Sequence, residues 1–284
     1  MADDLDDRFI LDGAYPPDAL DGNPDGIKGI RKRKRPEKPS HQVAVGAPIY
    51  THKKHKPTAD PICQSPEALA QLLQRTLVKA FPKLSDLERD DLRIPESALV
   101  DTTAFATQRT HATLTDFVTT TCPTLAARIA QRPKHRAAPT AIVLAGAALR
   151  VADLTRALRP LKGESGGEIA KVCYLALARA LTDEASPGLF ARHFKLKDHV
   201  AYLAKTRVGV AVGTPARISQ LLAEPDALSV KALSHIILDF THLDTKQRSL
   251  LDIPETRVDT LRGVLGDARI RERLINGKTK LVFF

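Results

Sequence analysis

A chain of 284 residues, 43% of them hydrophobic, is long enough to bury a substantial core as one large domain or two small ones. Its formal net charge of +10 favours a polyanionic partner, nucleic acid ahead of membrane, although many basic proteins simply carry solvated cations. Aromatic residues make up only 5% and Trp is absent, which argues against recognition of stacked bases on an aromatic sheet.

The chain lacks the features of a secreted or membrane protein. Three widely spaced cysteines, Cys63, Cys122 and Cys173, form no disulfide framework, so we expect a reducing compartment. The first residues carry no apolar stretch typical of a secretory signal, and no run approaches the ~20 apolar residues of a membrane span. We therefore expect an intracellular protein without a membrane partner.

Residues 1–60 differ in composition from the rest of the chain. An acidic stretch rich in Pro and Gly (1–26) precedes a basic one, "IKGIRKRKRPEKPSHQ" (27–42). Such a segment cannot bury enough apolar surface to offset its ordering entropy, so we predict a disordered tail. Its basic cluster fits a nuclear-import signal or a phosphate-binding tail, and basic runs also occur by chance. The cluster consists of Lys28, Arg31, Lys32, Arg33, Lys34 and Arg35.

From about residue 61 the apolar residues follow the periods of helices and strands. In chain order, they predict a helix over 66–81, a strand over 140–146, a helix over 148–162, a strand over 208–212, a helix over 216–222, a strand over 235–240, helical segments over 245–252 and 255–265, and a strand over 278–284. Thr214 is expected as the N-cap and Pro215 as the first residue of the helix that continues over 216–222. The alternation predicts one α/β domain over 61–284, with a mostly parallel sheet covered by helices on both faces.

Three short stretches match functional motifs, but each lacks the sequence context that its motif requires. "GESGG" (163–167) matches G-x-S-x-G, but it follows a helix rather than a strand, so we expect a flexible loop. "NGKT" (276–279) lacks the first glycine of a phosphate-binding loop and is not followed by a helix. His52, His55 and Cys63 lack a fourth metal ligand. We therefore predict no metal site.

Two stretches together carry a more specific signal. "VGTPARI" (212–218) and "IILDFTH" (236–242) have the order strand, helix start, second strand ending in Asp. This order resembles the first RecA-like lobe of DEAD-box RNA helicases, in which Thr-Pro-Gly-Arg touches the RNA backbone. On this resemblance Thr214, Pro215 and Arg217 are candidate RNA contacts, with Ala216 in place of the Gly.

The catalytic motifs of that helicase lobe are not retained in this chain. In that family an Asp-Glu pair manages magnesium and the attacking water, but here Asp239 is followed by Phe240. No phosphate-binding loop is present, and the chain ends where the strand leading into the second lobe would finish. Because phosphoryl transfer depends on positioned charge, we expect no helicase activity, no catalytic residue and no cofactor. We expect Phe240 to pack in the interior and Asp239 to cap the loop beyond the strand.

Longer stretches resemble a narrower family, the CMS-one ribosomal small-subunit proteins. They are "IPESALVDTTAF" (94–105), "ALR" (148–150), "LTRALRPLK" (154–162), "FARHFKLKDHVAYLAKTRVGVAVGTPARI" (190–218), "IILDF" (236–240) and "LLDIPETRVDTLRGVL" (250–265). The resemblance implies a nuclear and nucleolar factor of the 90S pre-ribosome, or small-subunit processome. It implies pre-rRNA and pre-ribosomal proteins as partners, and neither a demonstrated reaction nor a small-molecule substrate.

One segment departs from that family. The residues "VCYLALARALTDEASPG" (172–188) separate two stretches that the family joins directly, so they are either a helical insertion or a short intron translated in error.

Cations near the predicted helices are expected to attract RNA in a salt-sensitive way, although each one taken alone could be merely solvated. They are Arg150, Arg156, Arg159, Lys162, Arg192, Lys195 and Lys197. Two alternatives stay open: a residual nucleotide-binding or hydrolysing protein that uses Asp239 on magnesium, and a protein-interaction adaptor without RNA contact.

Overall fold

The structure, a computed structural model, describes residues 63–173, 175–176, 192–193 and 195–284, which belong to one compact unit spanning 54–284. The predicted tail over 1–60, with its basic cluster, lies outside the described residues. So does most of the segment 172–188, of which only residues 172, 173, 175 and 176 are described. Within the described part, no helix is long and apolar enough to cross a bilayer.

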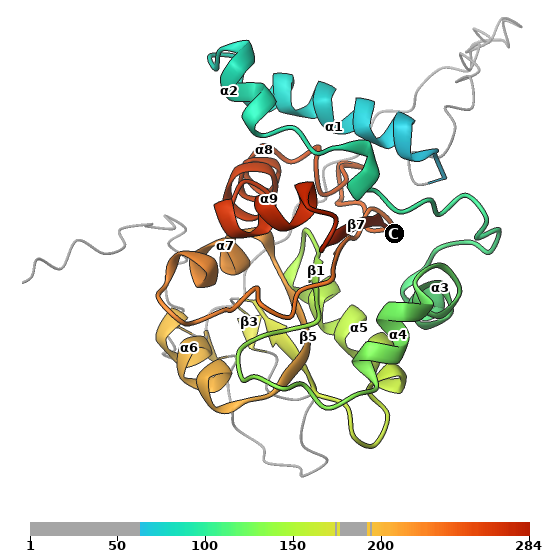
Figure 1. The fold of residues 1–284 in the computed structure, drawn as a ribbon, viewed down its shortest axis with the longest axis vertical. Coiled ribbons are helices and arrows are strands. Elements are labelled where there is room, and N and C mark those ends of the chain that lie inside the picture. Colours follow the sequence, from blue (N-terminus) through green and yellow to red (C-terminus); the bar gives the residue numbers. More distant parts are fainter. Residues whose placement is uncertain (1–62, 174, 177–191, 194) are drawn as a thin grey trace, which may run out of the picture. The chain divides into compact units, whose positions relative to one another are not determined.

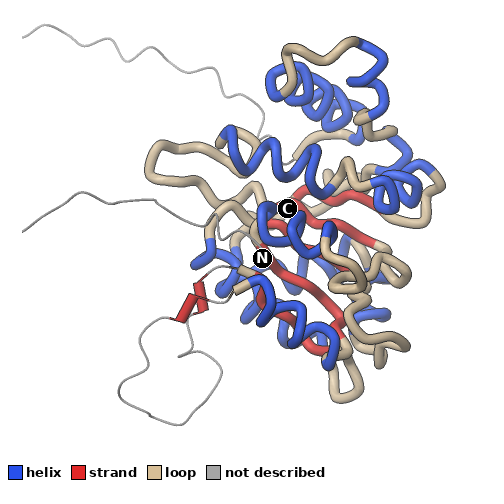
Figure 2. The backbone as a smooth tube through the Cα atoms, turned by 90° about the vertical axis from the view of Figure 1, so that its left-hand side faces the viewer, coloured by secondary structure: helices blue, strands red, loops and turns tan. Residues whose placement is uncertain are grey.

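Five parallel strands form the central sheet, in the order β2-β5-β1-β6-β7. Strands are red in Figure 2, with helices packed around the sheet. They are β1 (Ala141–Leu144), β2 (Glu168–Val172), β5 (Val208–Gly213), β6 (His235–Leu238) and β7 (Lys280–Phe283). A separate antiparallel pair joins β3 (Leu175–Ala176) to β4 (Arg192–His193). The predicted α/β class with a mostly parallel sheet is confirmed.

Helices lie on both faces of this sheet, as predicted (Figure 1). One face carries α3 (Leu114–Thr121), α4 (Pro123–Ile129) and α5 (Ala148–Leu158). The other core contains side chains of α1 (Pro66–Ala80), α6 (Leu196–Lys205), α7 (Pro215–Ala223), a π-helical turn (Asp259–Val264) that continues α8 (Pro254–Val258), and α9 (Ala268–Ile275). Shorter helices are α2 (Asp86–Asp91) and 3-10 turns at Glu96–Ala98, His111–Thr113 and Arg159–Lys162.

Side chains of the central strands divide between two hydrophobic cores. In β1, Ile142 and Leu144 face one core, whereas Ala141 and Val143 face the other. This follows from the period of two along a strand, and it explains why these strands read as continuous apolar runs. Burying each aliphatic side chain of Val, Ile or Leu contributes about 1.5–3 kcal/mol.

One predicted helix, over 245–252, is wrong. Residues 244–252 form turns instead, because short side chains bond to nearby backbone. The Asp244 carboxylate accepts the N–H groups of Lys246 (2.8 Å) and Arg248 (2.9 Å), and Asp252 accepts the N–H of Ser249 (2.9 Å). Gln247 has φ of 57°, a left-handed conformation that a helix excludes.

The outer edge of β7 is covered by residues 99–109. The Val100 N–H donates to the Leu281 carbonyl oxygen (3.0 Å). Arg109 donates to the carbonyl oxygens of Phe283 (3.0 Å) and Thr102 (2.7 Å), and its guanidinium lies 5.0 Å from the Phe117 ring centroid. This cover removes one of the two exposed edges that an open sheet presents.

Two buried histidines predict a loss of stability in mild acid. Burial lowers the pKa of both His199 and His235 to about 4, helped by nearby cations: Arg217 for the first, Arg128 and Lys280 for the second. The unfolded chain therefore binds more protons between pH 6.5 and 4, and stability should fall as the pH drops through that window. Each shift corresponds to about 3 kcal/mol at full effect.

Urea denaturation at pH 7 and at pH 4.5 measures this loss. The variant His235→Gln should reduce the difference between the two pH values, and the exposed His135→Gln serves as its control. A stability that does not change between pH 6.5 and 4.5 would contradict the prediction.

Candidate functional site

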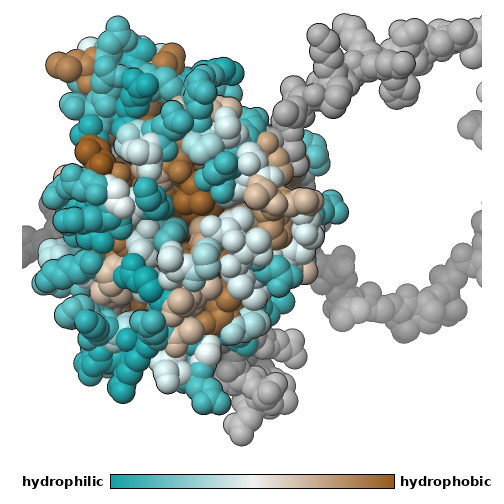
Figure 3. Space-filling model, turned by 45° about the vertical axis from the view of Figure 1, so that its right-hand side comes forward, coloured by the Kyte–Doolittle hydropathy of each residue, from teal (hydrophilic) through white to brown (hydrophobic). Residues whose placement is uncertain are grey.

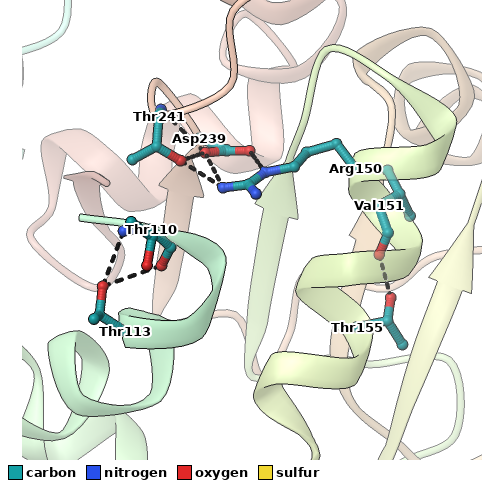
Figure 4. A network of polar contacts seen from close by, with 7 residues as sticks. All are labelled: Thr110, Thr113, Arg150, Val151, Thr155, Asp239 and Thr241. Carbon is teal, nitrogen blue, oxygen red and sulfur yellow. Dashed lines mark hydrogen bonds and ion pairs between the residues drawn. The ribbon is translucent and has the colours of Figure 1, made fainter. Parts of the chain in front are cut away.

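In parallel α/β sheets, ligands usually bind where the carboxyl ends of the strands meet. Here that edge brings together Arg150, at the start of α5, and Asp239 and Thr241, which follow β6 (Figure 4). Arg150 and Asp239 are 89 residues apart in the chain.

The three side chains form a closed network. Arg150 Nε donates to Asp239 Oδ2 (2.7 Å) and its Nη2 to Asp239 Oδ1 (3.3 Å) and Thr241 Oγ1. Asp239 Oδ1 also accepts the N–H (3.1 Å) and the hydroxyl (2.6 Å) of Thr241. Each carboxylate oxygen thus has a donor from the chain itself.

This network leaves the carboxylate enclosed. The Asp239 side chain is 0% exposed, and that of Arg150 is 9% exposed. The prediction that Asp239 caps the loop beyond its strand is confirmed by its bond to the Thr241 N–H. A correction follows for Arg150, which was expected to attract RNA: its charge is buried and compensated inside the domain.

Phe240 packs in the interior, as predicted. Its side chain is buried and its ring centroid lies 5.0 Å from that of Phe283. Its N–H donates to the Phe284 carbonyl oxygen (2.7 Å), so the backbone is fixed as well. In the described part of the chain, no group of three or more His, Cys, Asp or Glu could hold a metal ion.

The candidate RNA contacts lie at the start of α7. Thr214 is the N-cap residue and Pro215 the first residue of the helix, as predicted, although the Thr214 side chain makes no capping hydrogen bond. Arg217 is only 1% exposed and is among the largest fully buried side chains. The expectation that Arg217 presents its guanidinium to RNA is therefore corrected, because the side chain is buried. A contact of RNA with Thr214 and Pro215 stays a prediction.

A feature that sequence reasoning missed lies at the opposite end of the sheet. The loops that precede β1, β5, β6 and β7 meet at the amino ends of these parallel strands. Cations of these loops, of the last turns of α4, α6 and α9 and of the first residue of β7 form what we call the amino-end basic face. It consists of Arg128, Arg132, Lys134, Arg136, Lys205, Arg207, Lys231, Arg273, Lys278 and Lys280.

Hydrogen bonds between the loops hold this face together. The Ala137 N–H donates to the Thr206 carbonyl oxygen (3.1 Å), and the Ser229 N–H donates to that of Ala137 (2.7 Å). Arg207 Nη1 donates to the Pro133 carbonyl oxygen (2.8 Å). The loop cations Arg132, Lys134, Arg136, Arg207 and Lys231 are therefore carried on connected loops rather than on separate ones.

The cations of this face influence one another. Arg128 and Arg273 donate to the neighbouring carbonyl oxygens of Ala232 (3.0 Å) and Leu233 (2.6 Å). Burial and the nearby Arg128 charge lower the pKa of Arg273. The sequence signal was the run "RPKHR" (132–136), which contains three cations and no acid.

The visible surface is mostly polar. On the side that Figure 3 shows, hydrophilic side chains dominate and the apolar areas form separate patches. Large exposed apolar side chains in the described residues include Leu87 on α2, Leu149 on α5 and Ile275 on α9. Single exposed apolar residues are normal, whereas a connected group of cations is not explained by folding alone.

Among solved structures, the chain is similar to DEAD-box proteins. A DEAD box protein from Methanococcus jannaschii has a TM-score of 0.35 and 17% identity, over 62% of this chain and 37% of that one. S. cerevisiae Dbp5 bound to RNA has a TM-score of 0.35 and 16% identity, over 74% and 43%. This chain thus spans less than half the length of those proteins.

Curated relatives are more similar and match at greater length. Protein CMS1 of Chaetomium thermophilum is 34% identical, over 75% of this chain and 76% of the relative. Protein cms1 of Schizosaccharomyces pombe is 28% identical, over 78% and 71%, and Protein CMSS1 of Xenopus laevis is 26% identical, over 92% of each. The family described as CMS1, U3-containing 90S pre-ribosomal complex subunit, matches residues 21–284. The chain therefore belongs to the CMS1 family.

Proposed function

We propose that this protein is a non-catalytic assembly factor of the small-subunit pre-ribosome, and that it binds pre-rRNA through the amino-end basic face. The CMS1 family is described as a subunit of a 90S pre-ribosomal complex, and this description supports a role in ribosome biogenesis. The observation that carries the RNA contact is the set of cations on the connected loops before β1, β5, β6 and β7 and on the adjoining ends of α4, α6, α9 and β7.

The face suits a phosphate backbone. Arg132, Lys134 and Arg136 are exposed, and among the described residues none of them forms an ion pair. Cations that are not compensated by the protein release counterions when they meet phosphates, which makes binding strong at low salt and weak at high salt. Since the loops are tied to one another, little ordering entropy is lost on binding.

The carboxyl end of the sheet supports a function without catalysis. Arg150 and Thr241 occupy both oxygens of Asp239, and Phe240 stands where a water-activating Glu would be needed. Phosphoryl transfer requires an accessible carboxylate for magnesium and a base or positioning group for water. The residual nucleotide-binding alternative is tested by titration with fluorescent ATP, since micromolar magnesium-dependent binding would support it.

The basic cluster of the tail supports import into the nucleus, since a short run of Lys and Arg is the pattern of a nuclear-import signal. Lys28 and the run from Arg31 to Arg35 supply six cations within eight residues. They are also a second candidate contact for pre-rRNA. We propose nuclear and nucleolar localisation on this basis.

The RNA contact is tested by fluorescence anisotropy with a labelled pre-rRNA fragment across a series of salt concentrations. The variant Arg132→Ser/Lys134→Ser/Arg136→Ser should lower affinity at least tenfold near physiological salt. It should also reduce the slope of log affinity against log salt by about 2, because each phosphate contact to single strands contributes about 0.7.

A matched control removes the same charge elsewhere. Lys79→Ser/Lys83→Ser/Lys246→Ser deletes three exposed cations that lie on α1, just after it and after β6. This variant should keep the slope of the wild-type chain. Equal slopes for both triple variants would contradict the proposal and favour the adaptor alternative. A chain lacking residues 1–60, measured in parallel, separates the contribution of the tail from that of the domain.

A further inference from the structure

The two outer edges of the sheet differ in whether another segment of the chain covers them. Residues 99–109 cover the outer edge of β7, as described above. The outer edge of β2 pairs with no strand among the described residues, because β2 is paired only with β5. An edge without a paired strand offers backbone groups to another chain.

The hydrogen-bond pattern shows which groups of β2 face outward. The Glu168 N–H donates to the Arg207 carbonyl oxygen (2.8 Å), and the Val172 carbonyl oxygen accepts the Thr214 N–H (3.3 Å). Residues of a strand alternate in the direction of their backbone groups, so those of 168, 170 and 172 face β5. The N–H and C=O groups of Ile169 and Lys171 therefore point away from the sheet.

A trough of about 160 Å³ lies along this edge. Ile169 and Lys171 belong to its lining, together with Glu168 at the start of the strand. Its walls come from α5, on one face of the sheet, and α6, on the other. They consist of Ala152, Thr155 and Arg156 of α5, the following Arg159, and Asp198, His199 and Tyr202 of α6. The outward backbone groups of β2 thus lie between two helices, beside a space large enough for one aliphatic side chain.

The charges in the trough are unbalanced. Lys162 Nζ donates to the Glu168 carboxylate (2.8 Å). Arg159, Lys171 and Asp198 form no ion pair among the described residues, although Asp198 accepts the backbone N–H of Lys195 (3.1 Å). The trough therefore carries two cations outside any ion pair against one such carboxylate, an excess of positive charge for whatever binds there.

We propose that the β2 edge binds an extended acidic segment of a partner protein, which adds to the sheet as a further strand. The backbone of the segment would pair with Ile169 and Lys171, one apolar side chain would enter the trough, and a carboxylate would meet Arg159 and Lys171. A peptide supplies both donors and acceptors to these backbone groups. A phosphate backbone supplies acceptors only, so it would leave the outward carbonyl oxygens unpaired.

This proposal concerns a protein partner, and it is independent of RNA binding at the amino-end basic face. A synthetic peptide with alternating Glu and Val tests it on the full-length chain. Hydrogen exchange should show protection of the Ile169 and Lys171 amides when the peptide binds. A peptide with Gln in place of each Glu should bind at least tenfold more weakly.

Two variants separate the backbone contact from the charge contact. Lys171→Pro removes an outward N–H without removing a bond to β5, and Arg159→Glu reverses one cation of the trough. Each should weaken peptide binding at least tenfold, whereas Lys197→Glu, at an exposed position of α6, should not. Circular dichroism shows whether each variant is folded. If Lys171→Pro does not fold, the result for Arg159→Glu decides the test.

Three outcomes would overturn the proposal. They are the absence of peptide binding at millimolar concentration, binding that protects no amide of β2, and protection of these amides by single-stranded RNA but not by the peptide. The last outcome would assign the trough to nucleic acid.

Discussion

Replacing Arg150 by Ala is expected to lower the free energy of unfolding by about 3–5 kcal/mol, because the change leaves Asp239 buried without its counter-charge. The Asp239 side chain is 0% exposed and accepts from Arg150 at 2.7 Å, so water cannot replace the lost partner without opening the core. Urea denaturation should show a lower midpoint with an unchanged slope.

Two further variants distinguish the ion pair from a general effect of mutation. Arg150→Met/Asp239→Leu removes both charges, and it should recover most of the stability lost in Arg150→Ala. Arg156→Ala breaks the exposed pair with Asp153 in the same helix and should cost less than about 1 kcal/mol. A cost below 1 kcal/mol for Arg150→Ala as well would show that the buried pair does not stabilise the domain.

Replacing Phe240 by Glu is expected to destabilise the domain by more than about 3 kcal/mol without creating ATP hydrolysis. A carboxylate at this position would be buried beside the Phe283 ring, and an uncompensated buried charge is costly. The new Glu would also find no accessible partner for magnesium, because the oxygens of Asp239 are bonded to Arg150 and Thr241.

Thermal unfolding and a phosphate-release assay measure the two parts of this prediction. Phe240→Leu retains an apolar side chain and should lose less stability than Phe240→Glu, which separates the charge from the loss of the ring. Magnesium-dependent turnover by folded Phe240→Glu would contradict the view that the carboxyl end of the sheet is closed. The wild-type chain provides the baseline.

Sequence patterns were sufficient for the buried strands of the sheet. β1, β6 and β7 lie within the predicted ranges, and β5 extends one residue beyond its range, because strands covered on both faces need apolar side chains on both sides. The strand β2, "EIAKV", was not predicted from the sequence, because an edge strand tolerates Glu168 and Lys171, which weaken its apolar pattern. The false helix over 245–252 contains only two apolar residues, the adjacent Leu250 and Leu251, and side chains such as Asp244 bond locally to the backbone there.

For the candidate site, local inferences succeeded and long-range ones failed. The capping role of Asp239 and the packing of Phe240 depend on their position just after a strand, which the sequence reveals. The pairing of Arg150 with Asp239 joins residues 89 positions apart, and the burial of Arg217 depends on how α7 packs. Spacing alone cannot distinguish a cation that faces solvent from one that neutralises a buried acid.

The cover over β7 has a consequence for the order of folding. Arg109 bonds to the carbonyl oxygen of Phe283, 174 residues later, and the Phe240 N–H bonds to that of Phe284. Neither contact can form until the ribosome has synthesised residues 283 and 284. Such distant pairing is slow, since the entropy of closing a long loop is lost before the contact forms. Folding of this domain should therefore finish after translation of residue 284, with β6 waiting for its neighbour on the nascent chain.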